Sequence, residues 1–335
     1  MNVTRLVGYA LAVFVLLNGC AKKQGPAEGK EKSPAKIVVQ LDWVAEPEHG
    51  GLYQALAKGF FIEAGLDVTL NQGGANAYPL QKVATGVAQF AQSDSTSVLQ
   101  AINEGLPLIN IAAVFQHDPS VFMLHEENPI SKWEELNGKT VMARPEYVFL
   151  PYLKKKYGID FKVIPQNFGL GQFVADKNFI QQGFYIAEPF YLIKNGAKPK
   201  WLYVWDAGFD AYTIIFSNKD FVKNNPEVTR KFIAAYIRGL RDYIEGDPTP
   251  AHEMMAKINP KAAQNLVEFK EFLNFSRGQI IKEHLADGHR ERGETYGKIT
   301  AERFANQIHQ LEDIDVLKKG KLTAADVMTD VYLPK

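Results

Sequence analysis

LDWVAEPEHGGLYQALAKGFFIEAGLDV (residues 41–68) joins the first predicted strand of the chain to the second. The strand before it, residues 36–43, is a short apolar run rich in β-branched side chains, which is typical of a buried parallel strand. Apolar or small residues then recur at Leu52, Ala55, Leu56, Gly59 and Phe60, the spacing of one helix face. Gly65 ends this predicted helix and residues 66–70 alternate as a second strand, so the stretch predicts a β–α–β unit.

Strands and helices keep alternating along the rest of the chain. Further strands are predicted at 88–92, 106–115, 121–126, 140–144, 161–165, 183–187, 201–205 and 211–218. Helices are predicted at 79–86, 95–105, 146–158 and 189–196, and beyond Asn225 the pattern is helical, with helices around 260–273, 277–286 and 300–311. This alternation predicts α/β layers with right-handed crossovers.

The length of the chain favours two lobes over one. We predict a first lobe from residues 37–117 plus 213–335, with residues 121–210 inserted as a second lobe. The chain would then cross between lobes twice, within 115–120 and 207–212, and these two strands would form the hinge.

The N-terminal residues predict export. Residues 6–17 are an apolar stretch too short to span a bilayer but suited to a secretory signal, so residues 1–19 are predicted to be a signal peptide. They end in LNGC, and Cys20, the single cysteine of the chain, would be the lipidated residue of a lipoprotein; the alternative is a buried free thiol. Residues 20–36 have the composition of a disordered tether.

The charge balance does not suggest a nucleic-acid partner. Lys and Arg number 38 and Asp and Glu also number 38, and the lysines are scattered rather than clustered. We therefore expect no nucleic-acid partner. A monomer attached to a membrane through its lipid is predicted.

Polar and aromatic residues follow five of the predicted strands. In open α/β sheets ligands bind outside the carboxyl ends of the strands, where helix N-termini present free N–H groups. We therefore predict a ligand site formed by Asp42, Trp43 and His49 after the first strand, Gly74, Ala75 and Asn76 after the second, Ser93, Asp94 and Ser95 after the third, and Tyr147 and Glu188 in the second lobe.

Each group also has a structural interpretation. Ser93, Asp94 and Ser95 are all good helix caps. Trp43 could fill core, His49 could be a satisfied turn histidine, and Glu188 before Pro189 could be a first-turn acid. The shared edge of the sheet is what favours ligand binding over these alternatives.

The opening stretch resembles the NMT1/THI5-like family of solute-binding proteins. GVAQFAQSDSTSVLQAINEGLPLINIAAV, YIAEPFYLIKNGAKP and SNKDFVKNNPEVTRKFIAAYIRGLRDYI are similar to later blocks of that family. The resemblance covers residues 37–246 and implies a type II periplasmic-binding-protein fold, two α/β lobes joined by a two-strand hinge. It further implies an extracytoplasmic lipoprotein that delivers its ligand to an ABC permease and its ATPase on a bacterial membrane.

The resemblance leaves the ligand open between two chemistries. Leu41-Asp42-Trp43 with His49 favours an aromatic heterocycle, such as a thiamine pyrimidine precursor or a riboflavin-like vitamin. An alkanesulfonate, taurine or nitrate would instead need an arginine or a helix N-terminus, which Arg144 or residues 73–77 could supply. No cofactor or metal is predicted.

An enzyme is the alternative from another class. Pyrimidine-synthesis enzymes of the same fold, by resemblance, carry an iron-associated cysteine-rich stretch, whereas this chain has no cysteine besides Cys20. A Gly-x-Ser-x-Gly elbow and a His-Glu-x-x-His motif are also absent from the sequence. We therefore predict a binding protein without catalytic residues.

Overall fold

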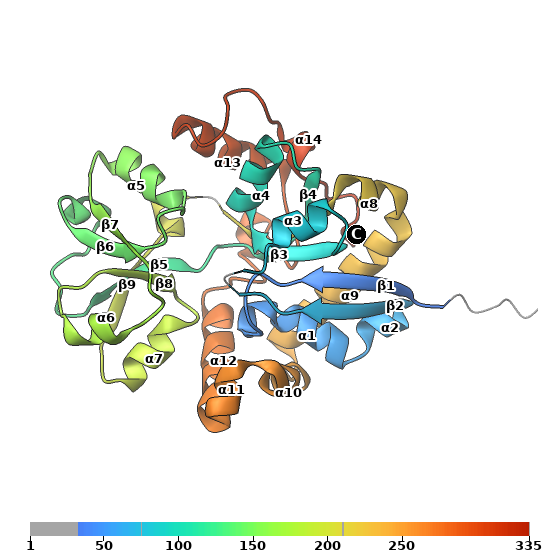
Figure 1. Ribbon diagram of the computed structural model, residues 1–335, viewed down its shortest axis with the longest axis horizontal. Helices are drawn as coiled ribbons and strands as arrows, with labels where there is room; N and C mark the ends of the chain where they lie inside the picture. The colour runs from blue at the N-terminus through green and yellow to red at the C-terminus, as the bar shows by residue number, and fades with distance from the viewer. Residues whose placement is uncertain (1–32, 75, 210, 335) are drawn as a thin grey trace, which may run out of the picture. The chain divides into compact units, whose positions relative to one another are not determined.

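Two five-stranded mixed sheets form the centre of the structure. The computed structural model describes residues 33–74, 76–209 and 211–334, and residues 34–335 make one compact unit. The predicted signal peptide, Cys20 and almost all of the predicted tether lie outside the described residues. The predicted α/β class with two sheets is confirmed (Figure 1).

The first sheet has the strand order β2-β1-β3-β10-β4. Its strands are β1 (Ala35–Gln40), β2 (Leu66–Asn71), β3 (Phe90–Asp94), β4 (Leu108–Phe115) and β10 (Thr213–Asn218). β1 is parallel to β2 and β3, and β10 runs antiparallel between β3 and β4. The carboxyl ends of β1, β2 and β3 therefore meet at one edge of this sheet.

The second sheet has the order β7-β6-β8-β5-β9. Its strands are β5 (Ser120–His125), β6 (Thr140–Ala143), β7 (Lys162–Pro165), β8 (Gln181–Phe184) and β9 (Pro199–Tyr203). β6 is parallel to β7 and β8, and β5 runs antiparallel to β8 and β9. The chain leaves the first sheet after β4 and returns to it at β10. The exact lobe boundaries, 37–117 plus 213–335 and 121–210, stay a prediction.

Helices follow most of the strands. They are α1 (Gly50–Ala57), α2 (Phe60–Glu63), α3 (Pro79–Ala84), α4 (Ser95–Asn103), α5 (Phe149–Tyr157), α6 (Gly171–Ala175), α7 (Glu188–Lys194), α8 (Lys219–Asn224), α9 (Pro226–Glu245), α10 (Thr249–Ile258), α11 (Pro260–Gln264), α12 (Leu266–Lys282), α13 (Ala301–Asp313) and α14 (Ala324–Val327), with 3-10 turns at Pro47–His49, Trp133–Leu136, Trp205–Ala207 and Arg290–Arg292. None of the helices in the described part is long and apolar enough to cross a membrane.

The predicted helix between β1 and β2 is divided into α1 and α2. Gly59 has φ +74°, a left-handed conformation that ends α1 and lets α2 begin in a new direction. α1 packs closely on α9, because a Cβ on Gly51 would lie 2.8 Å from the Cα of Leu240. The small residues of this stretch thus allow close helix packing that the apolar periodicity alone did not show.

The C-terminal helices differ from the prediction in two places. α12 runs unbroken from residue 266 to 282, where two helices were predicted, and α10 was not predicted. α12 also packs against α7, which follows a strand of the second sheet: Phe272 lies 5.3 Å from Tyr191 between ring centroids, and Lys194 Nζ lies 2.6 Å from Glu271 Oε2. α12 is therefore a third link between the elements of the two sheets, beside the two strand crossings.

Candidate functional site

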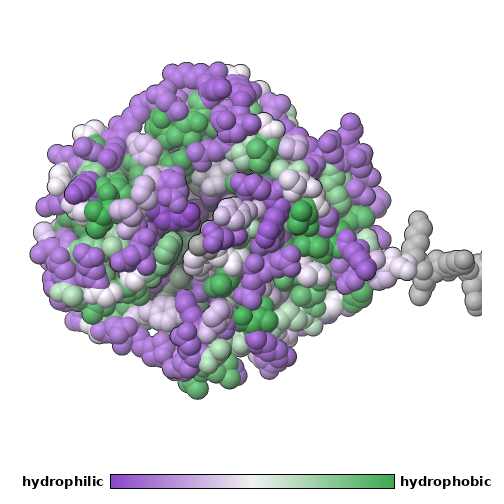
Figure 2. Space-filling view, in the orientation of Figure 1, coloured by the Kyte–Doolittle hydropathy of each residue, from purple (hydrophilic) through white to green (hydrophobic). Residues whose placement is uncertain are grey.

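A cavity of about 670 Å³ lies where the carboxyl ends of both sheets converge. Its walls come from the segments after β1, β2 and β3 on one side and after β6, β7 and β8 on the other. The face shown in Figure 2 is mostly hydrophilic and is hollowed near its middle. The volume is within the range of sites that enclose a small molecule.

Most of the predicted site residues meet at this cavity. The predicted residues that line it are Asp42, Trp43, Gly74, Ser93, Asp94, Tyr147 and Glu188. His49, Asn76 and Ser95 are not among the lining residues, and Ala75 lies outside the described residues. The location of the seven lining residues agrees with the rule that ligands bind at the carboxyl ends of strands, while their binding of a ligand stays a prediction.

His49 does not line the cavity but contacts Asp42, which does. It is fully buried, its Nε2 lies 2.9 Å from Asp42 Oδ1, and its Nδ1 accepts the N–H of Glu46 at 3.4 Å. Burial alone would lower the pKa of His49, but the carboxyls of Glu48 and Asp42 raise it overall. The structure therefore favours the satisfied-histidine interpretation: His49 orients Asp42, whose side chain is 35% exposed.

The glycine turn after β2 fixes the backbone of Asp42 and Trp43. Gly73 N–H donates to Trp43 O at 2.7 Å, and Gly74 N–H donates to Asp42 O at 3.0 Å. A Cβ on Gly73 would lie 2.2 Å from the carbonyl carbon of Asp42, so only glycine permits this approach. The turn thus holds the two cavity residues in place, and these N–H groups are not free for a ligand.

Two further acids of the loop after β1 line the cavity and were not predicted. Glu46 accepts from Lys261 Nζ at 3.0 Å, which ties this loop to α11. Burial raises the pKa of Glu48 to about 8, with a contribution from the nearby Glu46 carboxyl. The density of acids in residues 42–48 was the sequence feature that could have identified both.

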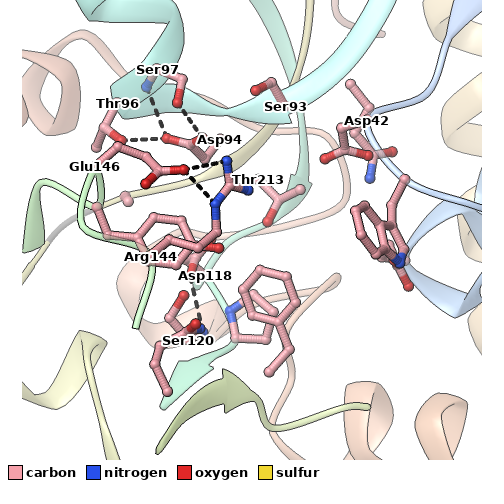
Figure 3. Close-up of a pocket in the computed structure, with 18 of the residues that line it drawn as sticks. Asp42, Ser93, Asp94, Thr96, Ser97, Asp118, Ser120, Arg144, Glu146 and Thr213 are labelled. Atoms are coloured by element: carbon pink, nitrogen blue, oxygen red, sulfur yellow. Dashed lines mark hydrogen bonds and ion pairs between the residues drawn. The ribbon is translucent and has the colours of Figure 1, made fainter. Parts of the chain in front are cut away.

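The polar groups at the β3–α4 junction bond to other groups of the protein. Asp94 caps α4, since its Oδ1 accepts the N–H of Ser97 at 2.8 Å and its Oδ2 accepts the Ser97 hydroxyl at 2.6 Å, with Thr96 as a further donor (Figure 3). Ser95 is fully buried and its Oγ accepts from Tyr212 N–H at 3.0 Å and from Gln307 Nε2 at 2.8 Å. Ser95, the first residue of α4, therefore links α4 to Tyr212 before β10 and to α13, and the helix-cap interpretation applies to Asp94.

The second sheet contributes charged and aromatic residues. Arg144 donates to Glu146 Oε1 from Nε at 2.7 Å and approaches it with a second nitrogen at 2.6 Å (Figure 3). Tyr147 stacks on Phe149 with ring centroids 5.0 Å apart. β8 ends at Phe184, three residues before the predicted end, and Glu188 Oε2 turns back to accept the Phe184 N–H at 2.7 Å. Burial raises the pKa of Glu188.

Aromatic rings from both sheets approach each other at the cavity. Trp43 follows β1 and Phe168 follows β7, and their ring centroids are 5.8 Å apart. Phe168 is 60% exposed and has φ +60°, an unusual conformation for a bulky residue. Flat apolar surfaces are thus available beside the carboxyls.

Other polar lining residues were also missed by the sequence analysis. Gln92, Asp118 and Gln166 are among them. Burial raises the pKa of Asp118, which lies in the crossing from β4 to β5, to about 6. Gln92 is a fully buried amide near the end of an apolar strand, and such a residue in a strand predicted to be buried is the feature that could have identified it.

Within the described residues, no group of three or more histidine, cysteine or acidic side chains is arranged to hold a metal ion.

The fold is that of periplasmic binding proteins. The crystal structure of the periplasmic aliphatic sulphonate-binding protein of Escherichia coli aligns with 90% of this chain and 95% of its own, with a TM-score of 0.63 and 11% identity. At that identity the likeness concerns the fold alone. The predicted fold class is thereby confirmed.

The chain belongs to the NMT1/THI5-like family, whose model matches residues 46–251. Similar relatives include the riboflavin-binding protein RibY of Chloroflexus aurantiacus, 26% identical over 77% of this chain and 79% of the relative. The formylaminopyrimidine-binding protein of Halalkalibacterium halodurans is 26% identical over 73% and 76%. A 4-amino-5-hydroxymethyl-2-methylpyrimidine phosphate synthase of Saccharomyces cerevisiae is 24% identical over 70% and 74%.

Proposed function

We propose that the protein is the extracytoplasmic solute-binding component of an ABC importer and holds a small aromatic heterocycle in the cavity. The observation that carries this proposal is a cavity bounded by the strand ends of two sheets, in a chain of the NMT1/THI5-like family. Segments after six strands of two sheets contribute to one cavity, which is the arrangement that can contact a ligand from two sides.

The charge of the cavity favours a ligand that donates hydrogen bonds. Acidic residues dominate the charged part of the lining: Asp42, Glu46, Glu48, Asp94, Asp118, Glu146 and Glu188. Arg144 is the one basic residue among the described lining residues, and it is already paired with Glu146. An anionic ligand would meet repulsion there, whereas ring amines, ring N–H groups and hydroxyls would find acceptors.

Groups at both sites that the sequence left open for an anion, Arg144 and residues 73–77, already bond within the protein. Arg144 is held by Glu146, and the N–H groups of Gly73 and Gly74 donate to the backbone after β1. The N-terminus of α4 is likewise occupied by the Asp94 carboxylate. An alkanesulfonate or nitrate would have to displace one of these contacts, which argues against that alternative.

The aromatic residues supply the complementary apolar contact. Trp43, Phe168 and Tyr147 offer ring faces on which a flat heterocycle can stack. Relatives named for riboflavin and for formylaminopyrimidine bind ligands that combine a flat ring with hydrogen-bonding edges. Both ligands match the acidic and aromatic lining described here.

The predicted partners and location follow from the same function. A binding protein of an importer acts outside the cytoplasm and hands its ligand to a permease driven by an ATPase. The predicted signal peptide and lipidated Cys20 would anchor a monomer to a bacterial membrane and keep it beside that permease. The predicted lobes would move about the two strand crossings.

The enzyme alternative is supported by the yeast relative, which is named as a synthase. The resemblance ties that activity to a cysteine-rich stretch, and Cys20 is the one cysteine in this sequence. Ligand returned unchanged after prolonged incubation with the protein, measured by mass spectrometry, is the result expected for a binding protein. Turnover would favour the enzyme.

A thermal-shift panel tests the function directly. Riboflavin, an aminopyrimidine, taurine and nitrate would each be added to the purified protein. A ligand present at about 100 times its dissociation constant stabilises the folded state by about 2.7 kcal/mol, which raises the melting temperature by a few degrees. We expect a heterocycle to do so, and a response to taurine or nitrate alone would contradict the proposal. Solution scattering with the responding ligand should show a more compact protein.

A further inference from the structure

The amide of Gln92 has no hydrogen-bond partner within the described part of the protein. The residue is 0% exposed, and neither its Nε2 nor its Oε1 is bonded. Burial of an unpaired amide opposes folding, so such groups are rare unless something completes them. Gln92 lines the cavity, two residues before Asp94 on β3, so the missing partner belongs on the cavity side.

A second unpaired amide oxygen lies in the opposite wall. Gln166 follows β7 of the second sheet, its Nε2 donates to Gln182 O at 3.1 Å, and its Oε1 is buried without a partner. Gln166 also lines the cavity. Each of the two sheets therefore contributes a cavity-lining glutamine with buried, unpaired amide atoms.

We propose that Gln92 and Gln166 form a polar subsite that selects ligands carrying an adjacent donor and acceptor, as in a lactam or an aminopyrimidine edge. This inference rests on the proposed function of the cavity. The Gln92 amide would pair with the edge through both of its polar atoms, and the Gln166 oxygen would accept a further N–H or O–H. An ionised carboxylate only accepts hydrogen bonds, whereas the Gln92 amide offers a donor and an acceptor side by side whatever the protonation of the carboxyls around it.

The subsite explains discrimination that stacking cannot provide. Any flat ring can stack on an aromatic side chain, so Trp43 distinguishes poorly among heterocycles. A buried amide left unpaired by the wrong ligand penalises that ligand, and hydrogen-bonding pockets discriminate most strongly in this way. Ligands that bridge Gln92 and Gln166 would also connect the two sheets.

The test uses the nearly isosteric variant Gln92→Met and a matched control, Gln307→Met. Gln307 is also fully buried with an unpaired oxygen, but it is not among the lining residues and its Nε2 bonds to Ser95. Since Gln92 has no partner to lose, Gln92→Met should keep or raise the melting temperature of the free protein and weaken ligand binding about 10-fold or more, about 1.4 kcal/mol. Gln307→Met should lower the melting temperature and keep the affinity.

A ligand-side change completes the experiment. Riboflavin is compared with its N3-methyl derivative, which lacks the donor of the lactam edge, and an aminopyrimidine with the analogue lacking the amino group. Removal of the donor should weaken binding to the wild type and have little further effect on Gln92→Met, a coupling that a double-mutant cycle measures.

The outcomes are distinct. A fall in melting temperature of Gln92→Met like that of Gln307→Met would show that Gln92 is structural, and equal affinities of wild type and Gln92→Met would also overturn the subsite. In either case a wild-type response to a heterocycle leaves the proposed function standing. If the wild type responds to none of these probes, the proposed function fails, and the subsite with it.

Discussion

The loop after β1 and the β3–α4 junction lie at the same edge of the same sheet, yet their acids have different partners. Asp94, the last residue of β3, has both oxygens occupied by the first turn of α4. Asp42, after β1, receives one contact from the buried His49, and its side chain is still 35% exposed. Location at a strand end therefore places a carboxyl at the cavity, whereas its neighbours decide whether its oxygens remain available.

The difference arises from the local chain. After β3 a helix begins at once, and Asp94 is the nearest acceptor for the Ser97 N–H in its first turn. After β1 a longer connection and a 3-10 turn precede α1, and Asp42 bonds to the His49 side chain instead of capping α1. The loop after β1 can therefore carry groups that bind a ligand, whereas the acid at the end of β3 is used as a helix cap.

The largest effect is expected from removing the support beneath the first loop. His49→Ala should destabilise the protein by about 2 to 4 kcal/mol, because it leaves a cavity and removes the partners of Asp42 and the Glu46 N–H. Denaturant unfolding measures the loss. His309→Ala, on the exposed face of α13, should change the stability by less than about 0.5 kcal/mol. Equal effects of the two substitutions would refute the structural role of His49.

The next effect concerns the ring beside Asp42. Trp43→Ala should weaken heterocycle binding by about 1 to 3 kcal/mol, because the stacking surface is lost, and wild-type Trp fluorescence should be quenched on binding. Trp43→Phe keeps a ring and should retain most of the affinity. Calorimetry with the ligand found by thermal shift would measure both, and unchanged affinity in Trp43→Ala would remove Trp43 from the site.

The acids of the first loop should make stability depend on pH. The pKa of Glu48 is about 8 in the folded protein against an ordinary value of 4.5, so the folded state holds a proton that the unfolded state has released. Stability from this group is complete below about pH 4.5 and declines as the pH rises toward about 8. The raised pKa values of His49 and Asp118 act in the same direction.

The variant Glu48→Gln isolates this contribution. This variant has no group that titrates at position 48. Its free energy of unfolding, relative to that of the wild type, should therefore increase by about 1.4 kcal/mol per pH unit between about pH 5 and about pH 8. Unfolding curves of both proteins across this range provide the measurement. A constant difference between them would show that Glu48 titrates normally.

The sequence predicted which residues would meet at the cavity better than how their side chains would pair. The apolar periodicity and the strand-end rule predicted that Asp42, Trp43, Ser93 and Tyr147 would lie close together, and all four line one cavity. The pairing of side chains depends on contacts between distant residues, such as Lys261 with Glu46, and no local pattern encodes them. Gln166 was missed for the same reason, since an amide outside a buried strand is conspicuous only when its surroundings leave it unpaired.

The smallest effect on stability is expected at the β3–α4 junction, where Asp94 already bonds within the protein. Asp94→Ala should lower stability by about 1 kcal/mol, the usual value of a helix cap, because Ser97 N–H loses its acceptor. Asp94→Asn keeps an acceptor and should cost less.

Ligand affinity in Asp94→Asn should stay within about twofold of the wild type, since the oxygens of Asp94 already serve α4. The same exchange at Asp42, where part of the carboxyl is exposed to the cavity, should weaken binding more. A larger loss of affinity at Asp94 than at Asp42 would contradict this expectation. It would mean that a carboxylate that caps a helix can still be the principal acceptor of the ligand.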